Sequence, residues 1–228
     1  MTVPTAPWTL SGESLVALAR GRTEVMEVPA GLHRVPGPTL VLAVSYRGSP
    51  VGPYLELALA QPARLGLRPG WCVVTMVVDS PRSRTAGTLN WGFPKQLGTL
   101  VWREDGDERE LRWVERGLVV RGRPLGPPLP VLAPVRALQR RGDGPVIVPG
   151  RLRGRARVAR VEVVVADDDE LAPLAGRHLG LHVAGGRLQV RPARRPVGLA
   201  SSLRAPLRAP LRAPEPALWF GSNLPWGD

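Results

Sequence analysis

Tyr54-Leu55-Glu56-Leu57-Ala58-Leu59-Ala60 alternates strictly between leucine and other side chains. Because successive residues of a β-strand point to opposite faces, the leucines share one face, and Glu56 shares the other with Tyr54 and the two alanines. The alternation therefore predicts a strand with a leucine face and a roomier face that carries a carboxylate. Periodicity leaves two interpretations of Glu56 open: it points into a cavity, or it marks the solvent side of an edge strand.

Apolar runs on both sides extend this β pattern. Residues 40–46 are almost continuously apolar, as in a strand buried on both faces, and residues 71–79 repeat that pattern. Asp79, Ser80 and Pro81 then predict the start of a short helix, with Asp79 or Ser80 as its N-cap. The 26 glycines and 26 prolines interrupt nearly every other stretch, so the composition predicts a mostly β protein.

The second half of the chain gives weaker signals. Residues 99–102 and 111–114 predict a hairpin across a charged turn. The five prolines of residues 124–134 predict an extended connection, and residues 135–140 predict a short helix. Two glycines, Gly185 and Gly186, predict a further hairpin turn.

Lys95 is the only lysine among 31 basic residues. An arginine stays charged in proteins, whereas a desolvated lysine can lose its proton and attack a carbonyl group. Trp91 and Phe93 flank Gly92, and Pro94 restricts the backbone just before the lysine. The amine therefore leaves a stiff, aromatic loop, as a reactive lysine would, although most lysines are solvated surface groups.

Residues 91–98, Trp-Gly-Phe-Pro-Lys-Gln-Leu-Gly, resemble the Schiff-base lysine motif of the acetoacetate decarboxylase family. In that motif an aromatic-Pro-Lys run is followed by Leu-Gly or Leu-Ala. Residues 7–13, 49–56 and 78–80 also resemble the family, in the same order along the chain. No specific motif follows residue 98.

The resemblance implies a single domain over residues 1–228, with the antiparallel β-barrel or curved-sheet fold of the family and few short helices. Within this domain, residues 203–216 form a Pro-rich, low-complexity segment near the end of the chain, built on a Leu-Arg-Ala-Pro repeat. The resemblance further implies homo-oligomers, which are common in the family.

The same resemblance implies the site. Lys95 falls on the imine-forming lysine, and Glu56 falls on a glutamate of the family's active site, which favours the cavity interpretation of that residue. We expect these two to be catalytic, with no cofactor and no metal. The residues that we expect to bind substrate are Trp91, Phe93, Tyr54, Gln96, Arg47 and Arg82, the two arginines only because they are near the motifs in sequence.

Three positions depart from the family pattern. Gln96 replaces the second lysine of the classical members, and Gly12 and Thr88 fall where the family has arginines. Activation of the amine is therefore expected to come from burial by Trp91 and Phe93, because burial favours the neutral form of a lysine.

The resemblance implies two possible functions, and the basic composition suggests a third, the binding of polyanions. The first is a Schiff-base-forming lyase acting on a small keto acid, either a decarboxylase or an aldolase-dehydratase; the alternative is a small-molecule binding module without turnover. The net charge of +12 could attract polyanions, but the arginines are scattered and no nucleic-acid motif accompanies them, so no nucleic-acid partner is expected. With one cysteine and no signal peptide or apolar span, we expect a cytoplasmic protein that does not enter a membrane.

Overall fold

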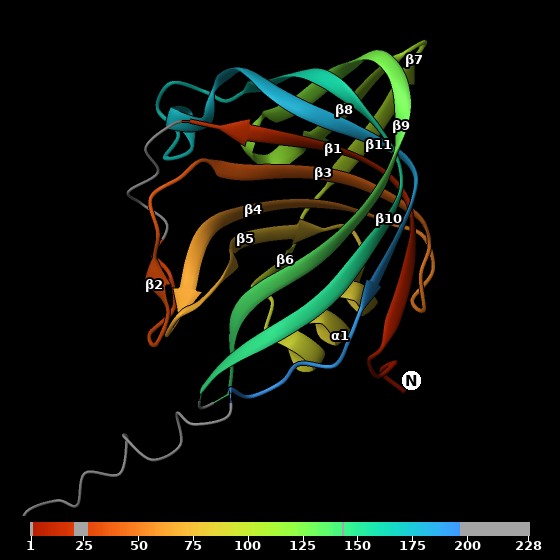
Figure 1. Ribbon diagram of the computed structural model, residues 1–228. Coiled ribbons are helices and arrows are strands. Elements are labelled where there is room, and N and C mark those ends of the chain that lie inside the picture. Colours follow the sequence, from red (N-terminus) through yellow and green to blue (C-terminus); the bar gives the residue numbers. More distant parts are fainter. Residues whose placement is uncertain (1, 21–26, 143, 197–228) are drawn as a thin grey trace, which may run out of the picture. The chain divides into compact units, whose positions relative to one another are not determined.

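One large, strongly curved sheet makes up most of the computed structural model (Figure 1). The structure describes residues 2–20, 27–142 and 144–196, which fall within one compact unit; the low-complexity segment 203–216 lies outside the described residues. The predicted mostly β, curved-sheet fold with few helices is confirmed.

The strands of the sheet are named in chain order. They are β1 (Trp8–Ala19), β2 (His33–Arg34), β3 (Thr39–Gly48), β4 (Tyr54–Leu65), β5 (Arg68–Val78), β6 (Lys95–Leu97), β7 (Leu100–Asp105), β8 (Glu108–Trp113), β9 (Leu118–Arg141), β10 (Gly144–Val164) and β11 (Gly176–Val190). Helix α1 (Pro81–Trp91) and two 3-10 turns, Val114–Arg116 and Ala172–Leu174, connect some of them. The strand order is β6-β5-β4-β3-β1-β11-β10-β9-β8-β7, and β2 pairs with β4.

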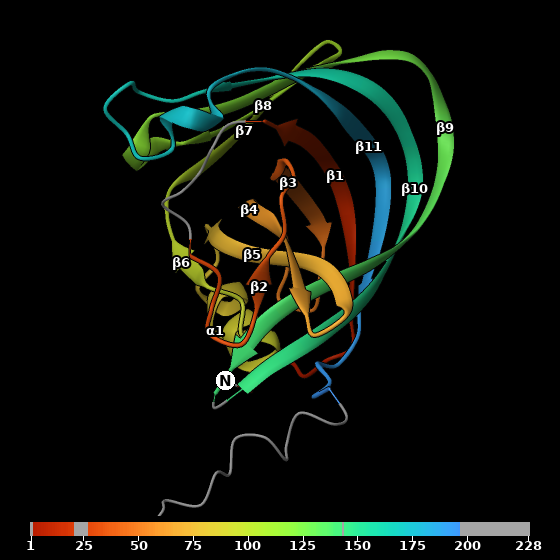
Figure 2. The same ribbon diagram turned by 60° about the vertical axis from the view of Figure 1, so that its left-hand side comes forward.

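Neighbouring strands are antiparallel except where β5 meets β6 and β9. Figure 2 shows β1, β11, β10 and β9 arching around β3, β4 and β5. A single parallel contact, Trp71 with Ala137, joins β5 to β9 across this arch. The sheet therefore folds back on itself.

Both faces of β4 are buried, each in a different core. Leu57 and Leu59 pack into one apolar cluster, whereas Ala58 and Ala60 belong to a second cluster on the opposite face. The interpretation of β4 as an edge strand with a solvent face is wrong, because β3 and β5 pair with it on both sides.

Residues 124–134 are not a connection but the middle of β9. Over this stretch β9 pairs with β10 on one side only, because β8 pairs with it only as far as Gly122. Proline lacks a backbone N–H and is tolerated on such an unpaired edge. The prediction of a helix at residues 135–140 is also wrong: this stretch continues β9, paired with β10.

The two glycines at 185 and 186 do not close a hairpin either. They lie within β11, which runs from Gly176 to Val190. Gly185 has a φ of 59°, and the pairing of β11 with β1 shifts between Gly12 and Ser14. The glycines therefore mark a bulge in a continuous strand.

Helix α1 delivers the lysine loop. Ser80 is its N-cap and accepts a hydrogen bond from the Ser83 N–H at 3.2 Å, with Pro81 as the first helical residue. The helix ends at Gly92, which has a φ of 73° and donates its N–H to Thr88. The chain then enters β6 beside β5, so that Lys95 lies opposite Met76. At 11 residues, α1 is the one α-helix in the described part of the chain, and it could not cross a bilayer.

Gly92→Ala should destabilise the protein much more than Gly106→Ala. Both glycines have positive φ, which costs another residue about 1–2 kcal/mol. A Cβ at Gly106 would have nothing within 4 Å, whereas one at Gly92 would overlap the Arg140 carbonyl oxygen. We expect the overlap to add about 1–3 kcal/mol, measured by urea unfolding. Equal losses in the two variants would contradict this account of the helix end.

Candidate active site

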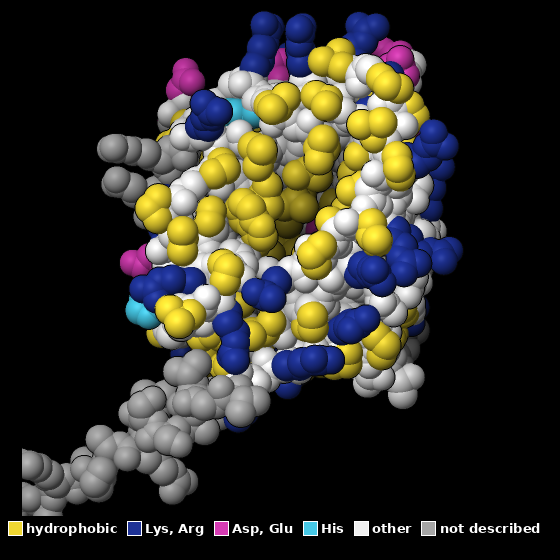
Figure 3. Space-filling model, viewed as in Figure 1, with side chains coloured by type: hydrophobic (Ala, Val, Ile, Leu, Met, Phe, Trp, Pro, Cys, Tyr) yellow, Lys and Arg dark blue, Asp and Glu magenta, His cyan; other side chains and the backbone are white. Residues whose placement is uncertain are grey.

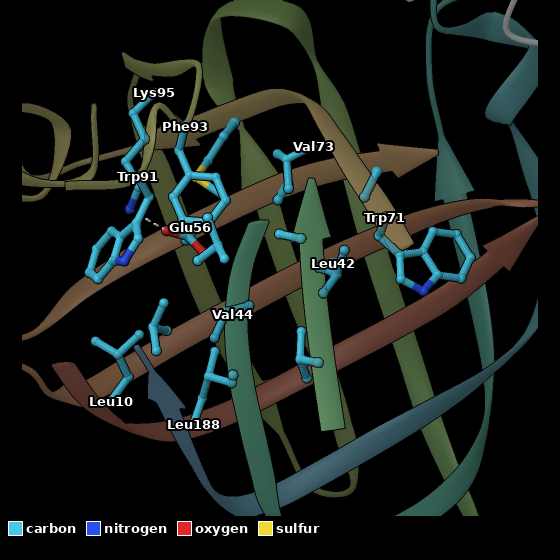
Figure 4. Close-up of a pocket in the computed structure, with 18 of the residues that line it drawn as sticks. Leu10, Leu42, Val44, Glu56, Trp71, Val73, Trp91, Phe93, Lys95 and Leu188 are labelled. Carbon is cyan, nitrogen blue, oxygen red and sulfur yellow. Dashed lines mark hydrogen bonds and ion pairs between the residues drawn. The ribbon is translucent and has the colours of Figure 1, made fainter. Parts of the chain in front are cut away.

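The amine of Lys95 is buried and paired. The side chain is 5% exposed, and Nζ donates to Glu56 Oε2 at 2.7 Å and to Ser83 Oγ at 3.0 Å. Figure 4 shows the ion pair at one end of a pocket. The lysine is therefore not a solvated surface group.

Two tyrosines surround the carboxylate of Glu56. The Tyr46 hydroxyl donates to Glu56 Oε1 at 3.4 Å, and the Tyr54 ring centre lies 5.2 Å from Lys95 Nζ. Burial, together with the nearby Glu56 charge, raises the pKa of both phenols well above the ordinary value. Both phenols therefore keep their protons and can donate hydrogen bonds beside the carboxylate.

Contacts from distant segments hold the lysine loop. Trp91 Nε1 donates to the Arg191 carbonyl oxygen at 2.8 Å, and the Trp91 ring meets that of Trp8 edge-on at a centroid distance of 5.1 Å. Phe93 packs against Trp91 at 5.9 Å, and Thr88 Oγ1 donates to the Phe93 carbonyl oxygen at 3.2 Å. The loop is thereby fixed to β1 and to the chain after β11.

Two small residues of α1 make room for the lysine side chain. Ser83 and Gly87 are four residues apart, so they lie on the same helix face. A Cβ at Gly87 would lie 2.6 Å from Lys95 Cε and 2.7 Å from Cδ. The lysine side chain therefore passes close to Gly87 on its way to Glu56, and it would have to shift to admit a Cβ at that position.

The pocket beyond the ion pair has a volume of about 160 Å³ and is mainly apolar. Figure 3 shows a hollow lined with hydrophobic side chains, with a small acidic area deep inside and basic side chains along its lower rim. The charged residues among its described lining are Glu56, Lys95 and Arg136. The apolar lining includes Trp8, Leu10, Leu40, Leu42, Val44, Ala58, Ala60, Trp71, Val73, Met76, Trp91, Phe93, Val148, Leu188 and Val190.

The structure brings five of the eight expected site residues together at one end of this pocket: Lys95, Glu56, Tyr54, Trp91 and Phe93. The other three do not line it. Gln96 is exposed on β6, where strand alternation turns it away from its neighbour Lys95. Arg82 is exposed on α1, and Arg47 pairs with Glu104 at 3.2 Å and with Glu13 at 3.7 Å.

Sequence reasoning missed four residues of the site. Ser83 and Gly87 could have been found from the helix start, because both lie on one face of α1 once Ser80 is taken as the N-cap. Tyr46 pairs directly with Tyr54 across β3 and β4, a register that alternation alone does not give. The fourth, Arg136, lies in the stretch that was interpreted as a helix.

Gly12, where the family has an arginine, has no room for any side chain. A Cβ there would overlap the Ser45 carbonyl oxygen. The adjacent Glu13 is buried and bonds to His182 and to Arg109, in a cluster that does not line the pocket. Among the described residues, no group of three or more acidic, histidine or cysteine side chains could hold a metal ion.

Comparisons with known proteins identify a similar family and similar folds. The acetoacetate decarboxylase family model matches residues 26–123, which contain Glu56, Ser83 and Lys95. No curated protein sequence matches. The resemblance to the acetoacetate decarboxylase family is confirmed by this match and by the shared fold.

Several solved structures share the fold. Acetoacetate decarboxylase from Legionella pneumophila has a TM-score of 0.67 and 16% identity, over 85% of this chain and 89% of that chain. The enduracididine biosynthesis enzyme MppR, complexed with pyruvate, has a TM-score of 0.64 and 14% identity, over 85% and 91%. MppR complexed with the condensation product of pyruvate and imidazole 4-carboxaldehyde has a TM-score of 0.60 and 15% identity, over 84% and 89%.

Gly87→Ala should disable the lysine without unfolding the protein. Alanine is favoured over glycine inside a helix by about 0.8–1 kcal/mol, but its methyl group would push the Lys95 side chain away from Glu56. Because a shift of about 1 Å can cost on the order of 100-fold, the rate at which borohydride traps a carbonyl compound on Lys95 should fall by about that factor.

The matched control is Gly144→Ala, where an added Cβ meets nothing within 4 Å. Gly144→Ala should trap the carbonyl compound on Lys95 at the same rate as the unmodified protein. Wild-type trapping in a folded Gly87→Ala variant would show that the space at Gly87 does not position the amine.

Proposed function

We propose that this protein is an imine-forming lyase that acts on a small keto acid, with Lys95 as the nucleophile and Glu56 as the acid-base group. The observation that carries the proposal is the 2.7 Å contact between a buried lysine amine and a buried carboxylate at the end of an apolar pocket. A lysine amine becomes a nucleophile when an apolar pocket removes it from water, and the carboxylate beside it can carry the protons of the reaction.

The first chemical step is imine formation. Glu56 accepts a proton from the Lys95 ammonium, and the free amine attacks the ketone carbon to form a carbon–nitrogen bond. The resulting carbinolamine breaks its carbon–oxygen bond, and a proton from Glu56 lets the oxygen leave as water. The product is a protonated imine on Lys95, which keeps the positive charge that the amine carried at the start.

The iminium then acts as an electron sink. With a β-keto acid, the bond to the carboxylate breaks, carbon dioxide leaves and the bonding electrons form an enamine. With pyruvate, Glu56 removes a proton from the methyl group, and the same kind of enamine attacks an aldehyde. In both cases we assign to Glu56 the transfer of protons to or from the enamine carbon, a role worth typically 10²-fold to 10⁴-fold.

The comparisons support both branches of this scheme. Two similar structures are named as acetoacetate decarboxylases, and MppR holds pyruvate or a pyruvate condensation product. We favour condensation, because decarboxylation needs the carboxylate to be held in place for cleavage. Apart from Lys95 and Glu56, the exposed Arg136 is the one charged residue in the described lining of the pocket.

A binding module without turnover is the second candidate. The same scarcity of cations favours it, since a keto acid could bind beside Lys95 without being held for carbon–carbon bond cleavage. Trapping and turnover measured on the same variants separate the two candidates.

Borohydride reduction in the presence of pyruvate should add one adduct to the peptide that carries Lys95, read by mass spectrometry. Lys95→Arg keeps the charge beside Glu56 and should stay folded, but a guanidinium cannot form the imine. This variant should show no adduct once the amino terminus is excluded. Absence of an adduct from the Lys95 peptide of the unmodified protein would disprove the role of Lys95.

Glu56→Gln should slow turnover much more than it slows imine trapping. Water can carry the proton transfers of imine formation, so Lys95 can still attack a carbonyl group without the carboxylate. Formation of new absorbing products from pyruvate and an aldehyde should fall by about 10² to 10⁴, because the enamine loses its proton donor and acceptor. Parallel loss of trapping and turnover would mean that Glu56 only shapes the pocket.

A further inference from the structure

The pocket continues well past the reactive end, along the face of β4 that carries Glu56. Ala58 and Ala60 follow Glu56 on that face, and at about 3.3 Å per residue they lie roughly 7 and 13 Å from it. Both alanines line the pocket, and Figure 4 shows Lys95 and Trp71 at its opposite ends. The pocket is therefore long as well as apolar.

The register of the sheet places apolar side chains beside both alanines. Ala58 pairs with Leu42 on β3 and with Met76 on β5, and all three line the pocket. Ala60 pairs with Leu40 and with Val73 in the same way. We call the parts of the pocket beside Ala58 and beside Ala60 its two alanine levels. A polar group of a ligand at either level would lose its hydrogen bonds to water without replacing them, which is unfavourable.

The reactive end alone would hold a three-carbon or four-carbon acid, and such a substrate would leave the two alanine levels unfilled. The small side chains of Ala58 and Ala60 keep that space open on a strand whose other face carries leucines. The far end opens beside Trp71, Val135 and Arg136, and the last two of these are exposed.

We propose that the natural substrate of this site is a keto acid with an unbranched apolar chain that lies along Ala58 and Ala60 toward Trp71. Carbon–carbon bonds of about 1.5 Å advance an extended chain by roughly 1.25 Å per carbon, so the level of Ala60 corresponds to about ten carbons. The carbonyl end of this proposal rests on the proposed function; the chain-binding end does not. The carboxylate of the substrate stays beside Lys95, because the nitrogen of that residue remains positively charged in the iminium.

The first test uses straight-chain 2-oxo acids from pyruvate to 2-oxodecanoate, trapped on Lys95 with borohydride. Burying a methylene strengthens binding by roughly fourfold, so the half-saturating concentration should fall about fourfold for each carbon added. A half-saturating concentration that stays constant or rises with chain length, while pyruvate is trapped, would overturn the proposal.

Two variants should shorten the accepted chain in a graded way. Ala60→Leu should weaken trapping of 2-oxodecanoate while leaving 2-oxohexanoate nearly unchanged, because the added side chain fills only the far level. Ala58→Leu should weaken both and still trap pyruvate. Ala166→Leu, a matched change at an exposed position after β10, should behave as the unmodified protein. If a folded Ala60→Leu variant no longer traps pyruvate, 2-oxohexanoate or 2-oxodecanoate, Ala60 does not lie beside the far end of the chain.

A second measurement separates the chain site from the imine. Straight-chain 2-alkanols cannot condense with an amine, so calorimetry with 2-butanol to 2-decanol reports the apolar part alone. Affinity rising with chain length and lowered by Ala60→Leu would support the chain site even if no acid is ever trapped, which would reject only the proposed function. Affinity independent of chain length would overturn the chain site. If Ala60→Leu does not fold, Val73→Phe narrows the same level from β5.

Discussion

The rest of the site depends on one buried ion pair, between Lys95 and Glu56. Removing two charges from water is costly, and a buried pair is tolerated only where further hydrogen bonds complete it. Ser83 supplies one to the amine, and Tyr46 supplies one to the carboxylate. The pair also needs β4 and β6 to lie on opposite sides of β5, which places residues that are 39 apart in sequence within 2.7 Å. The sheet order therefore serves the chemistry directly.

The strands that surround the site were predictable because their patterns are local. The alternation in β4 and the helix start at Ser80-Pro81 each involve consecutive residues. Both agree with the structure. The misinterpretation of residues 124–140 has the opposite cause. Prolines disfavour a central strand, and only the partners of β9 show that this stretch is paired on one side. Whether a strand is paired on one side or on both depends on the whole sheet, so a short stretch of sequence cannot show it.

The same distinction holds for the site. Lys95 and Glu56 could be proposed from the motifs, and the structure places them in contact. Arg47 and Arg82 were proposed because they are near the motifs in sequence, but nearness along a strand or a helix says little about direction. Arg47 turns toward Glu104 on β7, away from the pocket. Gly87 was missed because a glycine offers no functional group, and its contribution is an absence of atoms beside the lysine.

The two-sided burial of β4 has a consequence for how the protein can change. A slip of one residue in the pairing of this strand would turn Leu57 and Leu59 into the pocket and drive Glu56 into the apolar core on the other face. Such a slip would cost stability and chemistry together. The strand couples folding to function, and a chain that has paired β4 correctly has also assembled one wall of its reaction chamber.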